Sequence, residues 1–133
     1  MRILIVDDSR SMREIIKNSL SSIEGVEIHA APNGAEAETI LQELALDGKT
    51  IDVMFLDWMM PEFTGLELLQ SLNGASAFPK PGIVMLTAET YPDQVEACLK
   101  YGVSTYVTKP FTKETLLNAA AKAYAERTLK HAV

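Results

Sequence analysis

The sequence has little of what a disulfide-bonded or membrane-spanning protein needs. It contains one cysteine, Cys98, so no intramolecular disulfide can form, and the apolar row around it predicts a small buried side chain. No apolar run approaches the ~18 residues that span a bilayer. The short apolar start, Met1 to Val6, leads directly into Asp7 and Asp8, which no signal peptide does. We therefore expect a cytoplasmic protein without membrane insertion.

Positive charge is also scarce. Lysine and arginine number 12 against 18 aspartate and glutamate residues, which gives a formal net charge of -6. Such a chain repels nucleic acid and anionic membranes, so we expect no nucleic-acid binding, although a local acidic pocket could attract a divalent cation. The length of 133 residues suits one domain, 1–133, and the hydrophobic share of 47% is typical of a globular protein.

Short apolar runs rich in valine and isoleucine predict β-strands that are buried on both faces. Five such runs occur, at Ile3–Val6, Val26–Ala30, Val53–Leu56, Ile83–Leu86 and Ser104–Val107. The segments that follow them repeat apolar residues at i, i+3 and i+4, which predicts five helices. Residues suited to helix N-caps stand at Ser9, Asn33, Thr64 and Thr112, and glycines suited to helix ends stand at Gly25, Gly48, Gly74 and Gly102.

The regular alternation of strand and helix predicts an α/β fold. A parallel sheet covered by helices on both faces is the usual outcome of this pattern. Right-handed crossovers leave few topologies, and a common doubly wound arrangement of five strands has the order 2-1-3-4-5.

Polar residues follow four of the five predicted strands, and they are Asp7, Asp8, Asp57, Thr87 and Lys109. In the predicted order these four strands are neighbours, whereas the second strand, at the outer edge, ends without a charged residue. Ligands of open α/β sheets bind beyond the carboxyl ends of the strands, near the point where strand order reverses. We therefore expect three carboxylates, a hydroxyl and an ammonium group to meet in one crevice.

A cluster of three carboxylates indicates a bound cation, because the like charges repel one another. Oxygen ligands without histidine or cysteine favour a hard ion, and Mg²⁺ binds through one or two carboxylates plus phosphate oxygens. An aspartate in such a site can attack a phosphoryl group and form an aspartyl phosphate. The metal, Lys109 and the Thr87 hydroxyl could then each stabilise one phosphoryl oxygen.

Each of these residues also has an ordinary structural interpretation. An aspartate at a strand end is usually a turn former or a helix cap, Thr87 alone is a plain strand residue, and Lys109 alone is a solvated lysine. Asp52 stands at the start of the third strand, at the opposite end of the sheet, and is interpreted as a surface or capping residue. It is the joint occurrence at four adjacent strand ends that favours a functional site.

Five motifs together resemble the bacterial response-regulator receiver domain, in particular its stand-alone chemotaxis type. They are Ile3–Ser9, Ala31–Ala37, Asp57–Gly65, Thr87–Ala88 and Lys109–Phe111. The resemblance extends from Arg2 to about Tyr124 and implies a flavodoxin-like sheet. It also implies that Asp57 accepts the phosphoryl group and that Mg²⁺ is bound directly by Asp8, Asp57 and the backbone carbonyl of Met59.

The resemblance further implies that Asp7 holds metal-bound water and that Thr87 and Lys109 bind the phosphoryl group. The Lys109–Pro110 peptide would be cis. Tyr106 would be the switch aromatic, which turns inward as Thr87 moves and alters the surface of the fourth helix, fifth strand and fifth helix. The phosphoryl donor would be a histidine kinase, and the chain would be a switch with only self-directed phosphotransfer and autodephosphorylation rather than an enzyme.

Three alternatives remain open from the sequence. Since one helix follows Thr112, output must pass through a separate protein, either a target such as the flagellar motor switch or a histidine phosphotransfer protein in a relay. An aspartate-nucleophile phosphohydrolase of the haloacid dehalogenase type is disfavoured, because Asp7–Arg10 lacks its Asp-x-Asp-x-Thr pattern. A docking-only receiver is disfavoured because the acid pair, phosphoacceptor and lysine are all present. With no distinctive apolar seam, we expect a monomer or weak dimer.

Overall fold

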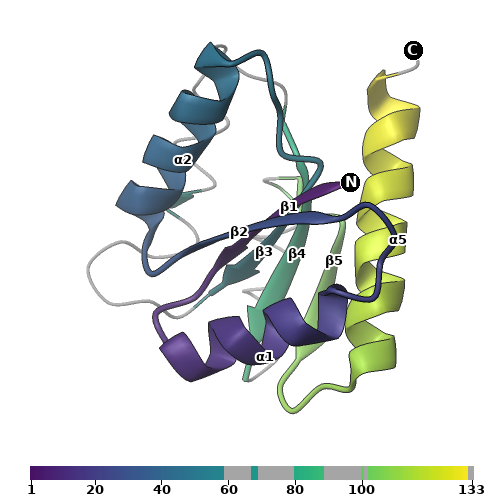
Figure 1. The fold of residues 1–133 in the computed structure, drawn as a ribbon. Coiled ribbons are helices and arrows are strands. Elements are labelled where there is room, and N and C mark those ends of the chain that lie inside the picture. The colour runs from purple at the N-terminus through teal and green to yellow at the C-terminus, as the bar shows by residue number, and fades with distance from the viewer. Residues whose placement is uncertain (59–66, 69–79, 89–99, 101, 132–133) are drawn as a thin grey trace.

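The fold is that of a five-stranded parallel sheet with helices on both faces (Figure 1). The computed structural model describes residues 1–58, 67–68, 80–88, 100 and 102–131, with side chains as far as 127. In chain order the elements are β1 (Arg2–Val6), α1 (Arg10–Leu20), β2 (Glu27–Ala31), α2 (Gly34–Leu46), β3 (Val53–Asp57), β4 (Gly82–Thr87), β5 (Thr105–Thr108) and α5 (Lys113–His131).

The strand order is β2-β1-β3-β4-β5, and every neighbouring pair is parallel. This confirms the predicted α/β class and the predicted order. Three of the five predicted helices are present as α1, α2 and α5. The predicted third and fourth helices fall largely outside the described residues, within which Glu67, Leu68 and Lys100 are helical.

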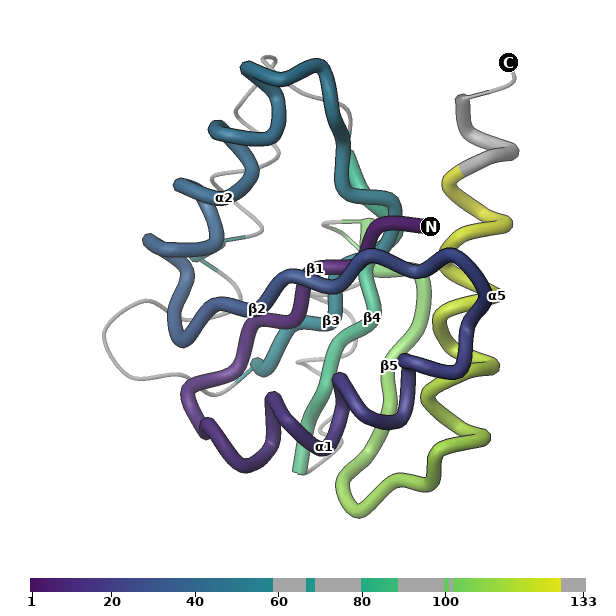
Figure 2. The backbone as a smooth tube through the Cα atoms, in the orientation of Figure 1, coloured from purple at the N-terminus to yellow at the C-terminus, as the bar shows by residue number. Residues whose placement is uncertain are grey.

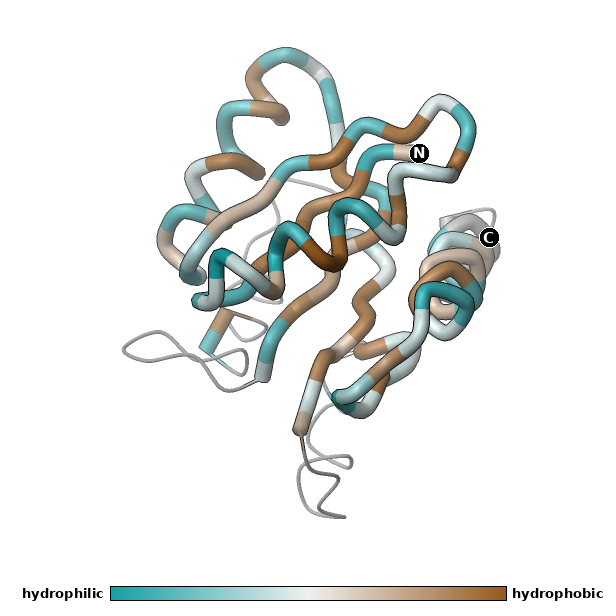
Figure 3. Tube along the Cα trace, turned by 60° about the horizontal axis from the view of Figure 1, so that its bottom comes forward, coloured by the Kyte–Doolittle hydropathy of each residue, from teal (hydrophilic) through white to brown (hydrophobic). Residues whose placement is uncertain are grey.

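The core has two halves because side chains alternate between the faces of each strand. Ile3 and Ile5 pack on one face with α1 and α5, while Leu4 and Val6 pack on the other face with α2. Figure 2 shows α1 and α5 together on one side of the strands and α2 on the other. Figure 3 shows hydrophobic residues along the central strands, with hydrophilic residues on the outer parts of the helices.

Three of the four predicted helix N-caps are formed by side chains in the expected way. Ser9 accepts a hydrogen bond from Met12 N at 3.2 Å, and Asn33 accepts one from Glu36 N at 2.9 Å. Thr112 also caps, since its Oγ1 accepts from Thr115 N at 3.1 Å. Thr64, the remaining predicted N-cap, lies outside the described residues. These caps fix where α1, α2 and α5 begin, directly beyond the carboxyl ends of the strands.

Helix α5 lies unusually close to β4. A Cβ built on Gly82 would stand 2.3 Å from the carbonyl oxygen of Ala123, so only glycine fits there without a shift of the helix. The buried face of α5 is made of small residues beside Leu116, namely Ala119, Ala120 and Ala123. This packing fixes α5 against the centre of the sheet.

Charged residues link α5 to β1 at the end of the sheet opposite the predicted acidic cluster. Asp52 accepts a hydrogen bond from Arg2 N at 2.7 Å and forms an ion pair with Arg127 at 2.8 Å, which links α5 to β1. The sequence placed Asp52 at this end, but interpreting it as a plain surface or capping residue missed the ion pair. The pairing with a residue 75 positions later depends on how α5 docks, which no local pattern reveals.

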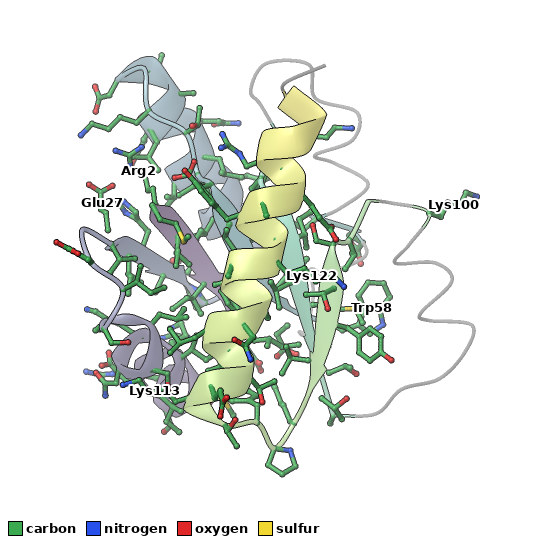
Figure 4. The ribbon with its side chains drawn as sticks, turned by 90° about the vertical axis from the view of Figure 1, so that its right-hand side faces the viewer. Arg2, Glu27, Trp58, Lys100, Lys113 and Lys122 are labelled. Carbon is green, nitrogen blue, oxygen red and sulfur yellow. The ribbon has the colours of Figure 1, made fainter. Side chains whose placement is uncertain are left out.

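Glu27 lies at the edge of the sheet between two basic groups. His29 Nε2 donates to its carboxylate at 2.9 Å, and Arg2 Nε donates to the same carboxylate oxygen. Figure 4 shows Arg2 and Glu27 side by side, far from Trp58. The hydrogen bond from His29 and that from Arg2 lower the pKa of Glu27 to about 2.

Candidate functional site

Parallel pairing brings the predicted acidic residues together at one edge of the sheet. Asp57 is the last residue of β3, and Asp7 and Asp8 follow β1, its neighbour. Carboxylate oxygens from these three residues all lie within 4.8 Å of one another. Asp7 is 0% and Asp57 5% exposed, whereas Asp8 is exposed. The cluster therefore has two buried members and one that opens to solvent.

Asp7 is held by protein groups at both carboxylate oxygens and along its backbone. Its Oδ1 accepts from Ser9 N at 2.8 Å, and its Oδ2 lies 3.4 Å from Lys109 Nζ. Its backbone N–H donates to Ala31 O at 3.1 Å, and its carbonyl accepts from Arg13 Nη1 at 2.8 Å. These contacts place a buried carboxylate in a fixed orientation, as a buried charge requires.

Lys109 brings an ammonium group into the acidic cluster. Its Nζ lies 3.4 Å from Asp7 Oδ2 and 3.6 Å from Asp57 Oδ1, with 22% of the side chain exposed. Its backbone N–H donates to Thr87 O at 2.8 Å, which continues the pairing of β5 with β4. The Lys109–Pro110 peptide is cis, as the resemblance implies.

Thr87 ends β4 beside the cluster. It is 3% exposed and lies in register with Thr108 at the end of β5. On its other side β4 pairs with β3, where Asp57 stands opposite Leu86. The next residue, Trp58, donates its backbone N–H to Leu86 O at 3.0 Å and is buried. The hydroxyl of Thr87 and the carboxylate of Asp57 thus come from adjoining strand ends.

The donor chemistry of the cluster fits a hard divalent cation. Three carboxylates face one ammonium group, so negative charge remains in excess and repels itself in a partly buried setting. Carboxylate oxygens with one solvent-facing member suit Mg²⁺, which retains water ligands. Asp7, Asp8 and Asp57 are the described residues that could hold it. Met59, whose carbonyl was predicted as a further ligand, lies outside the described residues.

Two observations concern residues around this centre. Tyr106, the predicted switch aromatic, lies on β5 and is 46% exposed. Arg13, whose guanidinium contacts the Asp7 carbonyl, was missed from the sequence. The sequence feature that could have identified it is a basic residue shortly after the acid pair, near the N-terminal end of a helix, where acidic residues are more common.

No helix within the described part of the chain is both long and apolar enough to cross a membrane.

Comparison with known proteins gives consistent matches over most of the chain. The model of the response regulator receiver domain family matches residues 3–121. A Chemotaxis protein CheY homolog from Campylobacter jejuni is 37% identical over 116 residues, which cover 87% of this chain and 86% of that protein. Chemotaxis protein CheY1 from Helicobacter pylori is 41% identical over 116 residues, with 87% and 90% covered.

Solved structures agree with these sequence matches. The chemotaxis protein CheY4 of Vibrio cholerae has a TM-score of 0.81 with this chain at 32% identity, covering 92% of this chain and 97% of that one. The strand order, the acidic cluster at the carboxyl edge and the family match all point the same way. The chain therefore belongs to the response regulator receiver domain family of two-component signalling.

Proposed function

We propose that this chain is a phosphoacceptor switch that takes a phosphoryl group from a histidine kinase onto Asp57 in a Mg²⁺-dependent reaction. One observation carries the proposal: the carboxylates of Asp7, Asp8 and Asp57 lie within 4.8 Å of one another, with Lys109 Nζ 3.6 Å from Asp57. A buried carboxylate beside a cation and further acidic metal ligands is suited to nucleophilic attack on phosphorus.

The chemistry assigns a separate task to each side chain. An Asp57 oxygen attacks phosphorus as the bond from phosphorus to the donor histidine nitrogen breaks, and the histidine leaves with the bonding electrons. Lys109 and the Thr87 hydroxyl each stabilise a phosphoryl oxygen. When bound by Asp8, Asp57 and the Met59 carbonyl, with Asp7 on its water, Mg²⁺ supplies charge neutralisation to the carboxylates and phosphoryl oxygens.

The output surface in this proposal includes β5 and α5. Tyr106 lines a pocket of about 270 Å³ between these elements, together with Asn118 and Lys122. Movement of Thr87 toward the phosphoryl group would free space behind it for the Tyr106 ring, which is 46% exposed. Phosphorylation then shifts the population between two packings of this surface and changes its affinity for a partner.

We further propose that the chain acts as a single receiver domain whose reaction is confined to itself. The family match over residues 3–121 and the coverage of 86% and 90% of the two bacterial relatives support this reading. A separate protein would receive the signal. The names of those relatives favour a chemotaxis effector over a relay intermediate, and the relay remains distinguishable because only it returns phosphate to a histidine protein.

Trp58, the only tryptophan, stands beside Asp57 and provides the test. Its fluorescence is followed while MgCl₂ and then acetyl phosphate are added to wild type and to Asp57→Asn. The proposal predicts a Mg²⁺-dependent change and then an acetyl phosphate response that the variant lacks. An acetyl phosphate response of equal size in both proteins, or a wild type that takes up no phosphoryl group, would rule the proposal out.

A further inference from the structure

Asp7 and Asp8 are adjacent in sequence but are held very differently. Asp7 is buried and bonded at both carboxylate oxygens. Asp8 is exposed, and among the described residues none donates a hydrogen bond to its carboxylate. The direction of the Asp8 side chain therefore depends on the backbone between β1 and α1. Whatever fixes that backbone also fixes the solvent-facing ligand of the acidic cluster.

Arg13 contacts this backbone from outside the cluster. Its Nη1 donates to the carbonyl oxygen of Asp7 at 2.8 Å, which is the peptide group that joins Asp7 to Asp8. Side chains on a helix lean toward its N-terminus, so Arg13 reaches back over the first turn of α1. Its own backbone N–H donates to Ser9 O at 3.0 Å, which anchors the residue on α1.

The position is an unfavourable one for a cation. The N-terminal end of a helix carries partial positive charge and is stabilised by acidic residues, yet the first turn of α1 contains none. A nearby positive charge also competes electrostatically with a bound divalent cation. Arg10, at the start of the same helix, shares this unfavourable placement, but of the two arginines it is Arg13 that contacts the Asp7 carbonyl, which indicates a role for that contact.

We infer that Arg13 is a positioning residue, which holds the Asp7–Asp8 peptide so that Asp8 points at the divalent cation. The inference rests on the proposed function, because it assumes that this cluster binds Mg²⁺. Groups that orient metal ligands without touching the metal typically change metal affinity about 10–100-fold when removed. Arginine suits the task because its planar guanidinium holds a hydrogen bond in a fixed direction.

The test relies on opposite expected changes in Mg²⁺ affinity: loss of a positioning contact should weaken Mg²⁺ binding, whereas loss of a nearby positive charge alone should strengthen it. In Arg13→Met the Mg²⁺ dissociation constant, from titration of Trp58 fluorescence, should rise about tenfold. In the matched control Arg10→Met, which removes an exposed cation one turn earlier on α1, the constant should stay within about twofold or fall, as expected for lost charge alone. Arg13→Lys, which keeps charge and one donor, should lie between wild type and Arg13→Met.

A second measurement needs no metal. The amide of Ser9 donates to Asp7 Oδ1, and its hydrogen exchange in the metal-free protein should be faster in Arg13→Met than in Arg10→Met. Equal Mg²⁺ affinity in both methionine variants, or tighter binding in Arg13→Met, overturns the inference even if that variant is less stable. A wild type that binds no Mg²⁺ overturns the proposed function. Equal exchange of the Ser9 amide in the two methionine variants overturns the positioning role of Arg13, whether or not Mg²⁺ binds.

Discussion

The three aspartates of the acidic cluster differ in how far they are exposed to solvent. Asp7 and Asp57 are buried carboxylates close to Lys109, whereas Asp8 faces solvent. The buried pair needs a neutralising partner, and the lysine supplies only one positive charge for three negative ones. A divalent cation that enters from the Asp8 side would complete the balance. The role of Lys109 can therefore be tested by a single substitution.

Replacing Lys109 with methionine should have opposite effects on phosphorylation and on metal binding. The rate of phosphoryl uptake from acetyl phosphate should fall by roughly 10²-fold, as when one charge-stabilising donor is removed from an active site. Mg²⁺ affinity should rise, because a cation 3.4 Å from Asp7 and 3.6 Å from Asp57 is lost. The rate of phosphoryl uptake is measured by gel electrophoresis that separates the phosphorylated protein, and Mg²⁺ affinity is measured by titration of Trp58 fluorescence. Lys113→Met, which removes an exposed lysine, is the control. An unchanged uptake rate contradicts the assigned role.

The lowered pKa of Glu27, which lies at the end of the sheet opposite the acidic cluster, predicts that the free energy of unfolding depends on pH. Its pKa is lowered from 4.5 to about 2 by hydrogen bonds from His29 and Arg2, so the folded state favours the ionised form. The resulting stabilisation is complete above the unfolded pKa and is lost as pH falls from about 4.5 toward 2. Urea unfolding of wild type and Glu27→Gln should therefore differ most at neutral pH and converge in acid. A constant difference across this range contradicts the account.

The site residues could be predicted because the strand order determines which strand ends lie next to one another. Once a parallel sheet of order 2-1-3-4-5 is assumed, Asp7, Asp57 and Thr87 must share one edge. The contacts of Arg13, Glu27 and Asp52 could not be predicted in this way. Each depends on side-chain direction or on helix docking, and Asp52 meets Arg127 only because α5 packs across the sheet.

Elements were easier to predict than their ends. The predicted second strand Val26–Ala30 runs from Glu27 to Ala31, and the predicted fourth strand begins one residue earlier, at Gly82. Hydrophobicity identifies the buried stretch, but hydrogen bonds with the neighbouring strand set its limits. Helix starts were more reliable, since Ser9 and Asn33 carry the caps in their own side chains.

The packing of α5 on β4 should make Gly82 intolerant of any side chain. In Gly82→Ala the new Cβ would meet a backbone oxygen at 2.3 Å, and the helix must shift to relieve the overlap. We expect a loss of unfolding free energy of about 1–3 kcal/mol in urea denaturation. Gly48→Ala is the control, where a Cβ meets nothing within 4 Å and only the φ of +72° disfavours alanine. A Gly82→Ala protein as stable as wild type contradicts the close approach.

For the whole molecule, the account predicts that Mg²⁺ stabilises the fold. At a free concentration ten times its dissociation constant, the ion should add about 1.4 kcal/mol by mass action. Asp8→Asn should lose most of this gain, yet be more stable than wild type without metal, because one of three repelling charges is gone. Asp47→Asn, which removes an exposed acid at the end of α2, is the control. Thermal unfolding at matched ionic strength measures all three proteins, and equal gains in all of them contradict the site.

The central claim is that Asp57 accepts a phosphoryl group in a site completed by a divalent cation. The most direct measurement is the intact mass of wild type and Asp57→Asn after incubation with acetyl phosphate, with Mg²⁺ or with EDTA. The account predicts one added phosphoryl group in wild type with Mg²⁺, little or none with EDTA, and none in the variant. No added group in wild type, or an equal gain in Asp57→Asn, would contradict it.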